Sequence, residues 1–272
     1  MTVPVFRYQG EAPIALMGGI YGNLPALDAC LTDAEQQGAG LLAFLGDMTG
    51  CSGHSDETIA LVRSQFHVVI AGNHEQKAAE GALVCGCGYS NPEDEKYGCL
   101  AHRYAMDSLS EEHRVWLQSL PDLALIETLQ GRLLLCHGSP AQTNEFLYES
   151  LLDASRLESW LAEYEAIGLG CTHTGLPWTR RLTGPRFAVN CGVVGKSDHD
   201  GDPAVHYALL KLDGTSFDVE IRRVTYDHDA WARQLEAEGV DSIFRTPIQT
   251  GIWTTGVASL PKSEQQRGIS RP

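Results

Sequence analysis

The chain passes repeatedly from a short apolar run, through a glycine and a polar residue, into a stretch with helical periodicity. The runs IALMGGI, LLAFLGD and HVVIAGN have this form, and helix-like segments at 24–37 and 55–65 follow the first two. Within the first segment, Leu24, Leu27 and Leu31 lie three and four residues apart, which places them on one helical face. This alternation predicts βαβ units, and therefore a sheet that is covered by helices.

Length and charge restrict the class of protein. The 272 residues predict one large domain at 1–240, with a C-terminal extension at 241–272 that packs on it and ends in a loose tail. A net charge of -15 disfavours binding to nucleic acid or to an anionic membrane, because both depend on clustered Lys and Arg. No secretory signal and no membrane-spanning run are visible. We therefore expect a cytoplasmic protein that acts on small molecules.

Other segments give further expectations about the fold. Residues 81–100 are rich in glycine and lack periodicity, which predicts a long loop. The runs LALIETL and RLLLCHG flank a QG turn and predict a hairpin. Three later runs, RFAVNCG, AVHYALLKLDG and SFDVEIRRVTY, predict a β-meander, and 227–239 predicts a helix. Trp253 and its apolar neighbours are expected to pack on the domain or on a partner subunit of a homo-oligomer.

The eight cysteines are expected to be thiols or metal ligands in a cytosolic chain of this size. Cys85, Cys87 and Cys99 lie close together in the sequence. Cys85 and Cys87 form a C-x-C pair that Cys99 follows alone, whereas common zinc modules contain C-x-x-C pairs. A zinc site would also need a fourth ligand, such as His102. This pattern favours loop thiols over a structural zinc site.

Polar residues follow directly after several of the apolar runs, where α/β proteins place their functional groups. They comprise one carboxylate, one amide, three imidazoles and one thiol: Asp47, Asn73, His74, His137, His173 and Cys171. This mixture of oxygen, nitrogen and sulfur suits zinc or a transition metal better than magnesium, which prefers oxygen ligands. The sequence therefore predicts a metal site at one edge of the sheet.

The ordered motifs GGIYGN, GDMTG, GNHE, CHGSP, GCTHTG and VNCGVVG resemble those of the calcineurin-like metallophosphoesterase family, in its small-phosphatase branch. The resemblance extends from about residue 14 to 225. It implies an α/β (α+β) fold, a four-layer αββα sandwich of two mixed sheets flanked by helices. It also implies hydrolysis of a small phosphomonoester or phosphodiester by a hydroxide held on one or two divalent transition metal ions, Fe, Mn or Zn.

The resemblance also implies a role for each matching residue. Asp47 is expected to bridge two metal ions, Asn73 and His137 to bind the second ion, and His173 to bind the first. His74 matches a histidine that is not a ligand, and is expected to stabilise the transition state or to protonate the leaving oxygen. A single Asp, Asn or His after a strand is more often a helix cap or a surface residue than a site residue. The six motifs in their family order favour the site interpretation here.

Three positions depart from the family pattern. Gly19 stands in place of an Asp ligand, Tyr21 in place of a His, and Cys171 in place of the first His of the fourth motif. A cation can bind Tyr and Cys as phenolate and thiolate, whereas glycine offers no ligand. The alternatives are a small buried thiol for Cys171, and a core-edge aromatic or substrate-stacking surface for Tyr21. We expect a weak or empty first metal site, which Gly19→Asp would restore.

The leading functional hypothesis is therefore a soluble, metal-dependent phosphoesterase that acts on a small phosphate ester. The alternative is an impaired or inactive protein of the same fold, as a pseudoenzyme, a binding module or an engineered knockout. Gly19 favours the alternative, and the retained polar set around Asp47 favours the enzyme.

Overall fold

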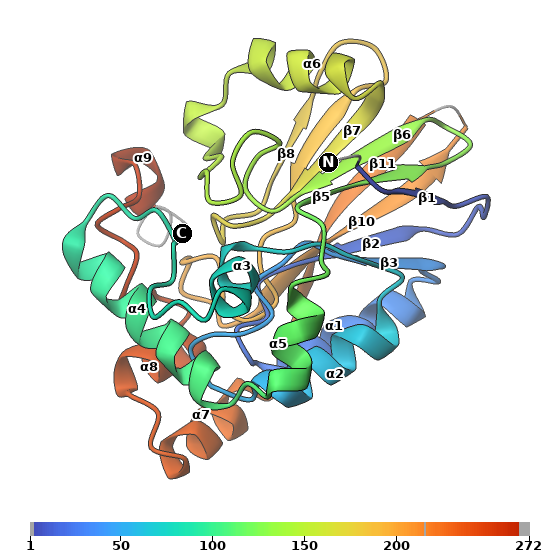
Figure 1. The fold of residues 1–272 in the computed structure, drawn as a ribbon. Coiled ribbons are helices and arrows are strands. Elements are labelled where there is room, and N and C mark those ends of the chain that lie inside the picture. The colour runs from blue at the N-terminus through green and yellow to red at the C-terminus, as the bar shows by residue number, and fades with distance from the viewer. Residues whose placement is uncertain (1–2, 215, 267–272) are drawn as a thin grey trace.

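A computed structural model describes residues 3–214 and 216–266 as two β-sheets that pack face to face, with helices outside (Figure 1). The five-stranded sheet contains, in spatial order, β11 (Ser216–Val224), β10 (Val205–Asp213), β2 (Ile14–Met17), β3 (Leu41–Phe44) and β4 (Val68–Val69). The six-stranded sheet contains β1 (Val5–Arg7), β5 (Leu123–Glu127), β6 (Arg132–Cys136), β7 (Ala166–Cys171), β9 (Phe187–Asn190) and β8 (Trp178–Arg181). Both sheets are mixed.

Helices cover the outer face of each sheet. Helices α1 (Leu24–Gln36) and α2 (Ser55–Gln65) lie on the five-stranded sheet, and α6 (Ala154–Glu163) lies on the six-stranded sheet (Figure 1). The expected four-layer sandwich is thereby confirmed. Strand β2 is buried on both faces, because Leu16 packs between the sheets while Met17 packs against the helices. This double burial explains why the run reads as continuously apolar.

Strand direction determines where the functional residues meet. Strands β2, β3 and β4 run parallel in one sheet, and β6, β7 and β9 run parallel in the other. The segments that follow the carboxyl ends of these strands lie at one edge of the sandwich. Among the short helices, α3 (Asn73–Ala79) follows β4 and the 3-10 turn η1 (Glu149–Leu151) follows β6, whereas α5 (Glu111–Leu117) precedes β5.

Two of the expectations about secondary structure are wrong. The segment predicted as a loop over 81–100 becomes helical from residue 92, where α4 (Pro92–Asp107) begins. Asn91 caps this helix by accepting hydrogen bonds from backbone N–H groups of its first turn, and Pro92 supplies a preset helical φ. The expected meander is also wrong, because β9 lies in the six-stranded sheet and only β10 and β11 pair as a hairpin. The hairpin of β5 and β6 is confirmed.

The C-terminal region packs on the rest of the chain. Helices α7 (His228–Ala237) and α8 (Ser242–Thr250) form an apolar cluster with α4, and α9 (Lys262–Gln265) lies on the same side (Figure 1). Trp253 is buried and donates its indole N–H to the carbonyl of Ser197, so it packs on the domain. The end of the expected loose tail, 267–272, falls outside the described residues. None of the described helices has the length and apolar character needed to cross a membrane.

Candidate metal centre

Three potential metal ligands converge between the two sheets. Asp47 follows β3, His137 follows β6 and His173 follows β7, and one ligand atom from each lies within 4.8 Å of the other two. Nε2 of His137 is 3.3 Å from Oδ2 of Asp47 and 3.0 Å from Nδ1 of His173. All three side chains are buried. The structure therefore brings together residues that are up to 126 positions apart, counting from Asp47 to His173.

Backbone carbonyls fix which imidazole nitrogens point into this cluster. Nδ1 of His137 is 2.7 Å from the carbonyl oxygen of Leu45, and Nε2 of His173 is 3.2 Å from that of Cys87. Because a carbonyl only accepts, each of these nitrogens carries the proton, and the lone pairs of the other two nitrogens face each other and Asp47. Two facing lone pairs require a proton or a cation between them. The donor set therefore fits a divalent metal ion.

The ionisation of the three groups agrees with this geometry. Burial opposes ionisation of Asp47, but the imidazoles of His137 and His74 hold the pKa of its carboxyl well below the ordinary value. Burial lowers the pKa of His137, but Asp47 outweighs burial and raises that pKa overall. Burial, together with His137, lowers the pKa of His173 to about 3. His173 is therefore neutral and able to bind a metal at physiological pH, whereas Asp47 favours the protonated form of His137.

Asn73 lies beside the cluster and has a free acceptor. Its side-chain N–H donates to the carbonyl of Cys85 at 3.0 Å, which orients the amide. The opposite atom, Oδ1, is buried and has no hydrogen-bond partner among the described residues. A buried polar atom without a partner is costly, and a cation bound next to Asp47 would satisfy it. The amide thus extends the donor set.

Glycines and one glutamate hold the two loops of this site together. A Cβ at Gly46 would lie 2.3 Å from the backbone nitrogen of Gly72, so only glycine allows this approach. Glu75 is fully buried and accepts hydrogen bonds from the backbone N–H groups of Asp47 (2.6 Å), Met48 (2.8 Å) and Gly72 (2.8 Å). Glu75 is thus a positioning residue, and its place in GNHE was the signal that the sequence analysis missed.

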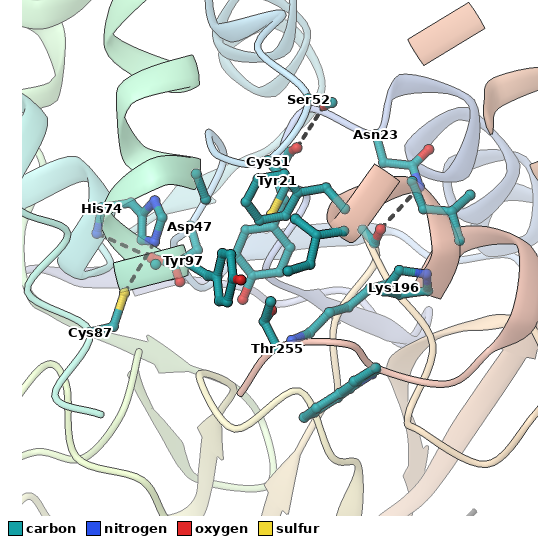
Figure 2. Close-up of a pocket in the computed structure, with 18 of the residues that line it drawn as sticks. Tyr21, Asn23, Asp47, Cys51, Ser52, His74, Cys87, Tyr97, Lys196 and Thr255 are labelled. Atoms are coloured by element: carbon teal, nitrogen blue, oxygen red, sulfur yellow. Dashed lines mark hydrogen bonds between the residues drawn. The ribbon is translucent and has the colours of Figure 1, made fainter. Parts of the chain in front are cut away.

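His74 lies directly after Asn73 at the start of α3. Its backbone N–H donates to Oδ1 of Asp47 at 3.3 Å, and its Nε2 is 3.5 Å from Sγ of Cys87. Nδ1 of this buried ring has no hydrogen-bond partner in the described part of the chain. Figure 2 shows His74, Asp47 and Cys87 together at one end of a pocket. His74 is therefore close to the cluster without being one of the three converging ligands.

Three of the six non-glycine residues that have a positive φ in the described part of the chain belong to the predicted site. Asp47, His173 and Tyr21 have φ values of 63°, 61° and 52°, in the left-handed region that side chains with a Cβ rarely adopt. Such conformations cost about 1 to 3 kcal/mol each and persist where the surrounding structure enforces them. Their presence in three of the predicted site residues supports a functional role for this region.

The pocket extends from the cluster to the C-terminal helices. Its wall includes Asp47, His74 and His173 at one end, and at the other end apolar residues of α7 and α8, namely Trp231, Leu235, Ile243, Phe244, Pro247 and Ile248. The surface is therefore polar where the possible ligands lie and apolar beyond them. The sequence analysis did not predict this wall, because no motif links α7 and α8 to the strand ends.

Lys196 also reaches into the pocket (Figure 2). Its Nζ is 3.7 Å from the ring centroid of Trp253 and 6.0 Å from that of Tyr21, so aromatic faces hold the ammonium group. It makes no ion pair with any residue of 3–214 or 216–266. Burial lowers its pKa, as expected for a cation away from bulk water. The sequence analysis missed this residue because a single Lys after a glycine carries no motif.

Comparison with known proteins agrees with this architecture. Residues 12–245 match the family described as calcineurin-like phosphoesterase, which is most of the chain. The chain belongs to this family. An uncharacterized protein of Methanocaldococcus jannaschii, MJ0912, is 26% identical over 235 residues, which cover 80% of this chain and 89% of that protein.

Solved structures show the same fold. A metallophosphoesterase from Sphaerobacter thermophilus superimposes with a TM-score of 0.68 at 23% identity, covering 89% of this chain and 100% of that one. The hypothetical protein PH1004 from Pyrococcus horikoshii superimposes with a TM-score of 0.69 at 20% identity, covering 89% and 99%. These likenesses establish the calcineurin-like fold.

Gly19 is the position where this chain departs most from the pattern of the family, and the space around it is closed. A Cβ at Gly19 would lie 2.4 Å from Cγ1 and 2.8 Å from Cβ of Val193, and the backbone there has a φ of 57°. Val193 is itself buried. The expectation that Gly19→Asp simply restores a ligand therefore conflicts with the packing, because Cβ of the new side chain would overlap Val193.

The other two departures lie in different surroundings. Tyr21 lines the pocket, with its ring centroid 6.1 Å from that of His74. Burial, with a contribution from Asp47, raises the pKa of its phenol, so the hydroxyl is neutral in the absence of a cation. Cys171 lies instead in the apolar cluster under α6, with Leu134 and Trp160 among its members. Of the predicted metal ligands, Asp47, His137 and His173 form the cluster and Tyr21 lines the same pocket, whereas Cys171 lies in the apolar core.

Metal binding is expected to release a proton from His137. Nε2 of His137 and Nδ1 of His173 face each other at 3.0 Å, so a proton lies between them when no cation does, and Asp47 favours that proton by raising the pKa of His137. A bound cation would displace it. Affinity for the metal should therefore fall as the pH is lowered. Calorimetric titration with Mn²⁺ in buffers of different ionisation enthalpy measures the released protons, and uptake without proton release would contradict the assigned tautomers.

Proposed function

We propose that this protein is a metal-dependent phosphoesterase that hydrolyses a small phosphomonoester or phosphodiester. The convergence of the lone pairs of Asp47, His137 and His173 on one point supports this proposal most strongly. Family membership supports the same class of reaction. Gly19 offers no ligand to a second ion, so we infer that one cation at Asp47, His137 and His173, with Asn73 beside it, is the principal centre.

The chain holds this centre through residues with separate tasks. A bound divalent cation would polarise a phosphoryl oxygen and help to generate the attacking nucleophile. Asp47 supplies the negative charge that balances the cation, and the carbonyls of Leu45 and Cys87 keep the two imidazoles in the tautomers that bind it. Glu75 fixes the backbone of Asp47 and Gly72.

His74 is the group that we assign to the leaving oxygen. Its ring lies in the pocket beside Asp47, and Nδ1 has no competing partner among the described residues. A proton held at this nitrogen can be donated to the departing oxygen, which typically contributes about 10²- to 10⁴-fold to the rate. Cys87 contacts the opposite ring nitrogen and limits rotation of the imidazole.

Lys196 is the group that we assign to the substrate phosphate. Its ammonium lies in the same pocket as Asp47 and His74, and Trp253 supports it from one side. An ammonium removed from bulk water binds a phosphoryl oxygen strongly. Since Gly19 leaves the first metal position without its carboxylate, we infer that Lys196 supplies positive charge that a second ion provides in dinuclear sites.

The apolar part of the pocket suggests the class of ester. Trp231, Phe244 and Ile248 line its far end, and Tyr21 and Tyr97 lie between that end and the cluster. Such a wall favours an organic group with an apolar or aromatic surface. We therefore propose a small aromatic or apolar phosphate ester as the substrate, rather than a polymer, which the net charge of -15 disfavours.

Hydrolysis of a panel of esters tests the proposal. The Mn²⁺-loaded protein would be assayed with naphthyl phosphate, p-nitrophenyl phosphate, bis-p-nitrophenyl phosphate and glycerol phosphate. We expect turnover of an aromatic ester, faster than that of glycerol phosphate, and its loss in His74→Asn with metal content retained. Binding of these esters without turnover would instead support the alternative that Gly19 favours, a binding module of the same fold.

Lys196→Met is expected to lower kcat/KM for the preferred ester about 10- to 100-fold, because one hydrogen bond to a charged group is lost. Methionine retains the apolar stem against Trp253, and the metal content should not change. The matched control is Lys211→Met, which removes a surface ammonium that pairs with Glu220. Equal kcat/KM values for Lys196→Met and the control would exclude a role in phosphate binding.

A further inference from the structure

Three side chains outside the candidate metal centre converge in the loop before α4 and in its first turns. Sγ of Cys85, Sγ of Cys99 and a carboxylate oxygen of Glu95 lie within 4.8 Å of one another. Glu95 and Cys99 are four residues apart on α4, so they share one face of that helix. Cys85 approaches them from the loop. Thiolate sulfur and carboxylate oxygen are both ligand types that bind zinc.

A fourth potential ligand, Cys87, lies next to Cys85. Its Sγ is outside the group of three ligand atoms and 3.5 Å from Nε2 of His74, so it would have to turn toward Cys85 to join them. Its backbone N–H donates to Sγ of Cys85 at 3.3 Å. An N–H group that donates to a sulfur stabilises the thiolate that a metal ion requires. His102, the ligand suggested by the sequence, points elsewhere, since its Nε2 is 2.9 Å from the carbonyl oxygen of Ala82. Cys87 therefore replaces His102 as the candidate fourth ligand.

Buried cysteines usually pack among apolar side chains of the core, but Cys85 and Cys87 do not. Four other buried cysteines belong to the apolar clusters of the two-sheet core: Cys30, Cys136, Cys171 and Cys191. Cys85 and Cys87 are as deeply buried but belong to none of the apolar clusters of the described residues. All eight cysteines carry free thiols, so no disulfide accounts for the grouping. The thiols of Cys85 and Cys99 face each other and Glu95 instead of apolar side chains.

We propose that Cys85, Cys99 and Glu95, with Cys87 as the fourth ligand, form a structural zinc site distinct from the cluster at Asp47. This zinc site does not depend on the proposed phosphoesterase activity. Such a site anchors a loop that contacts the metal centre at two points, since the carbonyl of Cys85 orients Asn73 and that of Cys87 orients His173. Loss of zinc is therefore expected to disturb the metal centre as well.

Cobalt spectroscopy of the full-length protein tests this site separately from the metal centre. Co²⁺ bound to thiolates gives an intense near-ultraviolet charge-transfer band, and the ligands at Asp47, His137 and His173 contain no sulfur. After chelation and addition of Co²⁺ alone under a non-thiol reductant, we expect the band in the unmodified protein and in Asp47→Asn. Added Zn²⁺ should abolish it. Absence of the band from both proteins would overturn the proposal.

Variants of the ligands complete the test. Cys85→Ser/Cys99→Ser should lose the band, while the control Cys30→Ala, which removes a thiol from the apolar cluster beneath α1, should keep it. Glu95→Gln retains every thiol, and it should shift the band and weaken Zn²⁺ binding by at least ~10-fold. An undiminished band in the double variant, or a Cys85–Cys99 disulfide in the metal-free purified protein that excludes Co²⁺, would contradict the zinc site.

Discussion

Asp47→Asn is expected to remove the cation from the metal centre and to lower phosphoesterase turnover at least ~100-fold. The carboxylate is the only anionic group in the three-residue cluster, and an amide cannot balance a divalent charge. Asparagine tolerates the left-handed backbone at this position, where φ is 63°, so the fold should persist. Elemental analysis and initial rates with the preferred ester measure the two losses.

The matched control is Asp33→Asn. Asp33 lies on α1 and pairs with Arg222 on the outside of the five-stranded sheet, so its loss should alter stability but leave the centre's metal in place. If Asp47→Asn and Asp33→Asn retained the same metal content and the same rate, the assignment of the centre to Asp47 would be wrong.

Gly19→Asp is expected to destabilise the protein by about 2 to 4 kcal/mol instead of restoring the first metal position. The new Cβ would overlap Cγ1 of Val193 at 2.4 Å, and the left-handed φ of 57° adds strain. Crowding contributes more than the backbone, because aspartate is among the residues that tolerate this region best. Denaturant unfolding of the two proteins measures the difference in the free energy of unfolding.

A second variant separates the effect of the overlap with Val193 from the ability of the new carboxylate to bind metal. Gly19→Asp/Val193→Ala removes the nearest overlapping atom and should recover part of the lost stability, relative to Val193→Ala alone. It should also bind more metal than the single variant, because the carboxylate gains room beside Tyr21. A stable Gly19→Asp protein with a raised metal content would instead show that Val193 moves aside and that the closed packing does not explain the missing ligand.

The sequence predicted the fold and much of the candidate site for a physical reason. Parallel strands place their carboxyl ends at one edge, so Asp47, His137 and His173 were expected to meet even though they lie far apart in the chain. The structure confirms the two-sheet sandwich that the motifs implied. Cys171 shows where this reasoning fails, because strand alternation directs its side chain under α6 and away from the cluster.

Features that depend on contacts between distant segments were not predictable from motifs. The closed space at Gly19 comes from Val193, and the environment of Lys196 comes from Trp253 in the C-terminal extension. Misreading the start of α4 as a loop also concealed the pairing of Glu95 with Cys99, since four residues form a common face only in a helix. Attention to the capping pair at Asn91 and Pro92 would have revealed that helix.

The most direct test of the central claim is the rate of ester hydrolysis by the metal-stripped protein, measured before and after adding Mn²⁺, with Asp47→Asn assayed in parallel. A metal-dependent centre at Asp47, His137 and His173 predicts no hydrolysis before addition, recovery in the unmodified protein, and none in the variant. Hydrolysis that is independent of metal, equal recovery in Asp47→Asn, or no hydrolysis of any ester by the metal-loaded protein would contradict the proposed function.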